Sequence, residues 1–115
     1  MVRKYLAAGV DAAWILVFVG IGRASHDSGG LSGFAGAVWP FLVGLGIGWV
    51  VLVWGGRVEP LTLGFGVGVW GSALVGGMVL RQLAGQGTAF AFVVVASVFL
   101  FAGLVGWRGI RRWLL

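Results

Sequence analysis

The chain has 115 residues, of which 60% are hydrophobic and only 10% charged. A soluble domain is typically about 45–50% apolar and about 25% charged, and a small globule cannot hide this much apolar surface from water. These values exclude a soluble fold and indicate a single membrane domain. The absence of cysteine excludes disulfides. The net charge of +5 does not indicate nucleic-acid binding, because the basic residues lie between apolar runs, as juxtamembrane charges do.

Four apolar runs predict four membrane-spanning helices, at residues 5–22, 34–54, 61–80 and 89–107. About 20 apolar residues cross the hydrocarbon core of a bilayer, and short connections make successive helices antiparallel neighbours. Pro40 lies inside the second run and predicts a kink at residues 36–40, because proline lacks an N–H and crowds the preceding turn. The predicted fold is an all-α integral membrane protein, a four-transmembrane-helix antiparallel bundle with a kinked second helix.

The distribution of lysine and arginine predicts the orientation of the bundle. One side carries Arg3, Lys4, Arg57, Arg108, Arg111 and Arg112. The other side carries only Arg23 and Arg81. Because cytoplasmic loops are enriched in basic residues, both termini are expected in the cytoplasm.

Small residues recur at four-residue steps along the third run and predict a smooth groove for helix packing. The residues of this groove are Gly64, Gly68, Ser72 and Gly76, and the second run has a shorter version with Gly44 and Gly48. Such seams let membrane helices approach closely. The two seams are expected to meet, while the sequence leaves open whether the longer one serves the monomer or a homodimer.

Asp11 is the first candidate functional residue, because it lies six residues past Tyr5, roughly 9 Å along the helix. A carboxylate at membrane depth usually faces the bundle interior or a water-filled cavity. One interpretation is a site of proton or cation exchange. The other is a fixed ion pair with Lys4, Arg57 or Arg108, which lie on the same side.

A second polar set is expected at the opposite end, and it consists of Arg23, His26, Asp27, Arg81 and Gln86. Two guanidinium groups at one mouth of the bundle could bind a carboxylate or a phosphate. The alternative is that the arginines extend to the interface and that one of them pairs with Asp27. His26 titrates near neutral pH and is either a pH sensor or a solvated loop residue.

Motifs for catalysis and cofactor binding are missing from the sequence. The glycines at Gly64, Gly66 and Gly68 lie inside an apolar run and not between a strand and a helix, so they are no nucleotide fingerprint. One histidine without cysteine cannot form a zinc site or ligate a haem from both sides. We therefore expect no metal, no cofactor and no enzyme activity.

Polar and aromatic residues form a distributed pattern: Asp11, Gly22-Arg23-x-Ser25-His26-Asp27, Trp39-Pro40-Phe41-x-x-Gly44, Gly48-Trp49, and Arg81 with Gly85-Gln86-Gly87-Thr88-Ala89. This pattern covers nearly the whole chain and resembles a family of small prokaryotic four-helix membrane proteins, domain of unknown function 3054. The resemblance implies a four-span protein of the inner membrane and brings no activity. Small multidrug transporters are similar in size and have an acidic residue in the first span, where this chain has Asp11, but further motifs are not shared.

The leading functional hypothesis is a small transporter or channel-like homo-oligomer, in which Asp11 is the coupling carboxylate and Arg23 and Arg81 lie at the outer mouth. An accessory subunit that packs against other membrane subunits through its glycine seam is the alternative. A third hypothesis is a lipid- or quinone-binding protein with an apolar pocket lined by Trp14, Trp49 and Trp70, although these rings could simply face lipid. Membrane lipids are the partners common to all three hypotheses.

Overall fold

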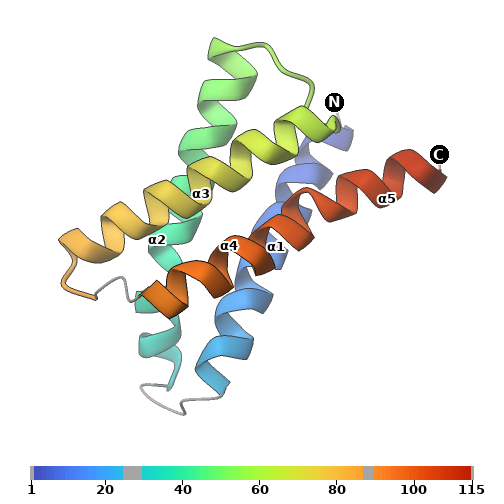
Figure 1. The fold of residues 1–115 in the computed structure, drawn as a ribbon. Coiled ribbons are helices and arrows are strands. Elements are labelled where there is room, and N and C mark those ends of the chain that lie inside the picture. Colours follow the sequence, from blue (N-terminus) through green and yellow to red (C-terminus); the bar gives the residue numbers. More distant parts are fainter. Residues whose placement is uncertain (1, 25–29, 87–89, 115) are drawn as a thin grey trace.

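The structure, a computed structural model, describes residues 2–24, 30–86 and 90–114, which are almost entirely helical (Figure 1). The elements are α1 (Val2–Ala24), α2 (Gly30–Val50), a π-helical turn η1 (Val51–Gly55), α3 (Leu63–Leu83), α4 (Phe90–Leu104) and α5 (Gly106–Leu114). Four segments are long and apolar enough to cross a membrane. The described ranges contain no strand. The prediction of an all-α membrane protein with four spanning helices is confirmed.

The hairpin of α3 and α4 crosses the hairpin of α1 and α2 obliquely (Figure 1). Both termini and the connection from α2 to α3 lie toward the same end of the bundle, as an even number of spans requires. The backbone is nearly continuous from α4 into α5, because the Val105 N–H donates to the Phe101 carbonyl and the Gly109 N–H donates to the Val105 carbonyl, each at 3.0 Å.

Several helix ends differ from the sequence prediction. Helix α2 begins at Gly30, inside the stretch expected as a loop, and the last helix continues beyond residue 107 to Leu114. Helix α3 runs to Leu83, so Arg81 lies in its last turn and not in the following connection. These helices extend past the apolar runs because a backbone can stay helical in the interface, where apolar composition is not required.

Gly85 ends helix α3 because its φ of +78° is left-handed. The Gln86 N–H donates to the Arg81 carbonyl at 2.8 Å, and the Gly85 N–H donates to the Gln82 carbonyl at 3.1 Å. This pair of bonds is the Schellman motif of helix C-termini. It returns the chain toward Arg81 and so brings the Gln86 side chain beside it.

Pro40 lies within helix α2 and is fully buried. The chain is helical on both sides of Pro40, from Gly30 to Val50. The kink expected at this position stays a prediction.

Helices α2 and α3 touch at the level of their backbones. A Cβ atom added to Gly44 would lie 2.8 Å from the Ser72 carbonyl oxygen and 3.1 Å from the Gly77 nitrogen, and one added to Gly76 would lie 3.0 Å from the Gly44 Cα. The Ser72 hydroxyl donates to the Gly44 carbonyl at 2.6 Å. Gly48 faces the same serine. The small-residue seams of the two helices therefore meet within one chain, as close membrane packing requires.

The longer groove departs from its prediction toward the start of α3. Gly68 receives the Leu52 side chain, which lies 2.6 Å from the Cβ position. Gly64 has no atom within 4 Å of that position, so it takes no part in the contact. The regular four-residue spacing overestimates the length of the seam, because helices α2 and α3 cross and separate toward the start of α3.

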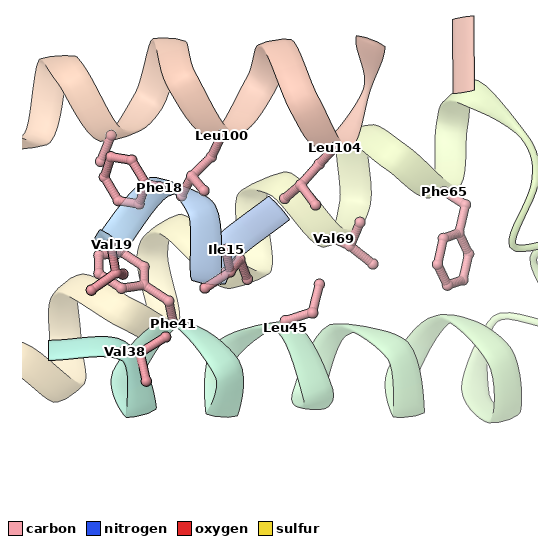
Figure 2. Packing of buried hydrophobic residues seen from close by; sticks show 12 residues of the cluster. Ile15, Phe18, Val19, Val38, Phe41, Leu45, Phe65, Val69, Leu100 and Leu104 are labelled. Carbon is pink, nitrogen blue, oxygen red and sulfur yellow. The ribbon is translucent and has the colours of Figure 1, made fainter. Parts of the chain in front are cut away.

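Apolar side chains from all four spanning helices form the core, and Figure 2 shows Ile15, Phe18, Phe41 and Leu100 converging between the ribbons. Four phenylalanine rings fill its middle. Phe18 lies edge-on to Phe41 at 5.7 Å and contacts Phe99 at 5.2 Å, while Phe41 contacts Phe92 at 6.2 Å, all between ring centroids. We call these four residues the phenylalanine cluster. Offset and edge-on contacts of this kind add to the stabilisation from burial.

Two tryptophans hold helix α4 through their indole N–H groups. The Trp14 N–H donates to the Phe99 carbonyl at 3.0 Å, and the Trp70 N–H donates to the Ser97 carbonyl at 2.9 Å. The Trp14 ring also lies across Gly103, in space that a Cβ atom would occupy. These half-buried rings are therefore bound between helices, an arrangement that neither the pocket nor the simple lipid-facing interpretation anticipated.

The close contact of α2 with α3 predicts that Gly44→Ala destabilises the protein by about 1–3 kcal/mol, because the added methyl meets backbone atoms that cannot rotate away. Gly46→Ala is the matched control in the same helix, since its Cβ position has nothing within 4 Å. Unfolding in mixed micelles measures both values. Equal stability of the two variants would contradict the packing described here.

Candidate functional site

Asp11 lies at the centre of a buried polar site on helix α1. Its carboxylate accepts four hydrogen bonds from described side chains. The Trp49 N–H of α2 donates to Oδ2 at 3.0 Å, and the Trp107 N–H of α5 donates to Oδ1 at 2.9 Å. The Arg108 guanidinium of α5 donates from Nη1 to Oδ1 and from Nη2 to Oδ2, both at 2.8 Å. One carboxylate therefore joins three helices.

Arg108 is the charge partner of Asp11, and both side chains are 0% exposed. The two parallel N–H to oxygen bonds give the bidentate geometry that is among the strongest charge-assisted hydrogen bonds. The Arg108 Nε donates to the Pro60 carbonyl, and the Arg108 Nη1 also donates to the Leu104 carbonyl, each at 2.8 Å. No buried side-chain nitrogen or oxygen of the described residues lacks a hydrogen-bond partner. The pair is therefore fully compensated in this conformation.

The connection between α2 and α3 places the Pro60 carbonyl at Arg108. Gly55 is the last residue of the π-helical turn, Gly56 follows it, and Arg57 adopts a left-handed φ of 54°, so the chain reverses tightly. Thr62 then caps α3, because its hydroxyl accepts from the Phe65 N–H at 3.2 Å and donates to the Glu59 carbonyl at 2.8 Å. This connection thus supplies a buried backbone acceptor to the site.

Aromatic rings surround the ion pair and exclude water from it. The Arg108 guanidinium lies 4.6 Å from the Trp107 ring centroid and 5.2 Å from that of Phe65. Trp49 packs edge-on against Phe65 at 4.6 Å. Cation–π attraction is stronger where the cation is desolvated. The rings therefore hold the guanidinium in place as well as seal the site.

The sequence interpretation left two roles open for Asp11, and the structure places it in an ion pair with Arg108. Sequence reasoning missed both tryptophan donors, and it assigned Trp49 to lipid or a pocket. A usable signal was present, because Trp107 and Arg108 are adjacent at the end of an apolar run on the same side as Asp11. Such a pair can donate to an intramembrane carboxylate.

The polar residues at the opposite end form a separate, exposed contact. Arg81 Nη1 donates to Gln86 Oε1 at 3.1 Å, and Gln86 Nε2 donates to the Gly36 carbonyl at 2.8 Å. The Arg81 guanidinium lies 4.4 Å from the Phe92 ring centroid. Gln86 therefore links α2 to the end of α3, while Arg81 stacks on α4.

The anion site expected between two arginines at this end stays a prediction. His26 and Asp27 lie outside the described residues, as does the side chain of Arg23. Among the residues that the structure describes, no group of three histidine or carboxylate side chains is arranged to hold a metal ion.

A family model with the description "Protein of unknown function (DUF3054)" matches residues 8–111, which include Asp11, both tryptophan donors and Arg108. No curated protein and no solved structure matches the chain.

The ion pair predicts a strong coupling between two substitutions. Arg108→Gln alone leaves a buried carboxylate without its charge partner, and Asp11→Asn alone leaves a buried guanidinium, so each is expected to cost about 3–5 kcal/mol. The double variant Asp11→Asn with Arg108→Gln removes both charges and is expected to cost clearly less than the sum. A double-mutant cycle of unfolding free energies in mixed micelles measures the coupling. Additive losses would show that the pair is not formed.

The close approach of α3 to Arg108 predicts that Gly66→Ala disturbs the site. A Cβ atom there would lie 2.9 Å from Arg108 Cδ and 3.1 Å from the Leu104 carbonyl oxygen. We expect a loss of about 1–3 kcal/mol in unfolding free energy. Gly64→Ala, in the same helix and with open space around it, is the control and is expected to change stability by less than about 1 kcal/mol. A similar effect of both substitutions would rule out a specific contact at Gly66.

Proposed function

The chain belongs to the DUF3054 family, whose description names no activity, and we propose from the geometry of the buried site that it is a small membrane transporter in which Asp11 exchanges Arg108 for a transported proton or cation. One observation carries the proposal: a carboxylate at membrane depth takes its donors from two other helices. Ionisable residues within membrane-spanning helices are costly and are known to mark ion and substrate pathways.

The shared carboxylate couples its occupancy to the arrangement of the helices. Trp49 binds it from α2, while Trp107 and Arg108 bind it from α5. A cation that replaces Arg108 on Asp11 removes the strongest bond between α1 and α5 but leaves the tryptophan bonds possible. Binding and release of the cation would therefore change how α5 packs on α1, which is the differential interaction that a two-state transporter needs.

Arg108 has other partners that lower the cost of this exchange. The carbonyls of Pro60 and Leu104 already accept from it, and the rings of Phe65 and Trp107 lie against its guanidinium. A guanidinium released from Asp11 would keep these interactions and would not be left isolated. This arrangement suits a pair that separates during a cycle better than one held only by its two charges.

In the proposed cycle, the described conformation would be the occluded state. Asp11 has no exposed surface, and the phenylalanine cluster lies between it and the contact of Arg81 with Gln86. A pathway through one copy would require these rings to move. A homo-oligomer would enlarge the space available to four short helices, and we include it in the proposal.

The proposed location is the inner membrane of a prokaryote with both termini in the cytoplasm, supported by the excess of lysine and arginine at that end. Asp11 and Arg108 would then lie nearer the cytoplasmic side, and Arg81 at the outer side. The proposed role is transport and not catalysis.

The two alternative functions have less support in the packing. An accessory subunit was to bind its partner through the glycine seam, but Ser72 and Gly76 face α2 of the same chain, and Gly68 faces Leu52 of η1. The lipid or quinone pocket was to be lined by Trp14, Trp49 and Trp70, whose N–H groups instead donate between helices. The transporter proposal keeps its central residue in a position consistent with its role.

We expect the protein in liposomes to carry protons when a potassium diffusion potential is imposed, with internal pH followed by an enclosed pH-sensitive dye. Asp11→Asn is expected to reduce this flux to the level of protein-free liposomes, because an amide cannot exchange a proton or bind a cation by charge. Glu59→Gln, a carboxylate in the exposed connection between α2 and α3, is the control and is expected to keep full flux.

The double variant Asp11→Asn with Arg108→Gln separates transport from folding. It contains no buried uncompensated charge, so it is expected to be stable and yet inactive. Flux in this variant equal to that of the unmodified protein would refute the role of Asp11. If the unmodified protein carries neither protons nor radioactive sodium under the same potential, the transporter proposal fails.

A further inference from the structure

A cavity of about 430 Å³ lies between the start of α3 and helix α5. Its lining residues are Leu61, Thr62, Leu63, Arg108, Arg111 and Arg112. No acidic residue is among them. The cavity therefore combines a strongly basic wall with an apolar one, at the end of the bundle where the chain terminates.

The charge of this cavity is not compensated within the described part of the chain. Asp11 neutralises Arg108. In contrast, the side chains of Arg111 and Arg112 have no hydrogen bond, ion pair or ring contact with a described residue. The N-terminus of α3, capped by Thr62, adds the partial positive charge of a helix dipole to the same space. An anionic group is the complementary ligand.

Helix α5 indicates where this ligand comes from. At about 100° per residue, its three arginines fall within an arc of about 100°, and apolar residues occupy the other side. Ile110, Trp113 and Leu114 are 62%, 91% and 77% exposed. A short helix with arginines on one face and exposed aromatic and aliphatic residues on the other is typical of the membrane interface. The cavity thus lies at headgroup depth, beside apolar side chains suited to acyl chains.

We propose that this cavity binds the phosphate group of an anionic phospholipid, with Arg111 and Arg112 as its donors. Guanidinium groups bind phosphate oxygens with paired hydrogen bonds, and anionic lipids attract basic segments next to a membrane span. Arg108 contributes to the wall but has no exposed surface, so the phosphate meets Arg111 and Arg112 first. The ligand would hold α5 against α3, and the proposal does not depend on transport.

Thermal unfolding in a neutral detergent tests the site with three probes: phosphatidylglycerol, phosphatidylcholine and inorganic phosphate. We expect phosphatidylglycerol to raise the unfolding temperature in a saturable manner, because a ligand that binds the folded state stabilises it. The variant Arg111→Gln with Arg112→Gln is expected to bind this lipid at least about tenfold more weakly, a fold-change equal to about 1.4 kcal/mol. Both side chains are unpartnered in the described chain, so the variant is expected to fold, which circular dichroism checks.

Arg57→Gln is the matched control, because Arg57 is an exposed arginine of the α2–α3 connection and does not line the cavity. Its affinity for phosphatidylglycerol is expected to equal that of the unmodified protein. Equal weakening by Arg57→Gln would reduce the effect to overall charge and overturn the proposal. Equal stabilisation by phosphatidylcholine, or by inorganic phosphate, would overturn the assignment to an anionic lipid.

Discussion

The ion pair between Asp11 and Arg108 is the interaction on which the arrangement of the bundle depends. Two charges in a water-free interior are costly unless every donor and acceptor is matched, and here the match requires α1, α2, α5 and the α2–α3 connection to be in place together. The apolar core does not specify this arrangement as strictly, since hydrophobic contacts tolerate small shifts. The polar site therefore selects one way of packing two crossed hairpins.

The glycine content of the chain follows from the same requirement. Arg108 reaches Asp11 across α3 only because Gly66 has no side chain, and Trp14 packs on α4 only because Gly103 has none. In lipid, where burial of apolar surface gives no advantage to helix association, such close approaches supply the van der Waals contact that stabilises the bundle. Glycine is thus a means of bringing polar donors to buried acceptors as well as a packing residue.

Four spans, their order and an inward-facing Asp11 could be read from the sequence, because hydropathy and the cost of a charge in lipid act locally. The seam of Gly44 with Ser72 was also foreseen, since its spacing is regular. The partner of Asp11 was left open among three cations, and the donors Trp49 and Trp107 were missed. Their roles depend on the crossing of the two hairpins, which is a tertiary property. The end of α3 was placed too early because a helix in the interface need not be apolar.

The two kinds of helix contact suggest which part of the bundle would move in a transport cycle. Helices α2 and α3 approach at the level of their backbones, and the Ser72 hydroxyl donates to the Gly44 carbonyl at 2.6 Å, so their separation would break close contacts along both helices. Helix α1 meets α4 through side chains, since Trp14 stacks on Phe99 at 4.8 Å and its N–H donates to the Phe99 carbonyl at 3.0 Å. Because Asp11 holds α1 to both α2 and α5, a change of charge at that one carboxylate would act first on the contacts of α1. In the proposed transport cycle, the helix that carries the site would therefore also be the helix that moves.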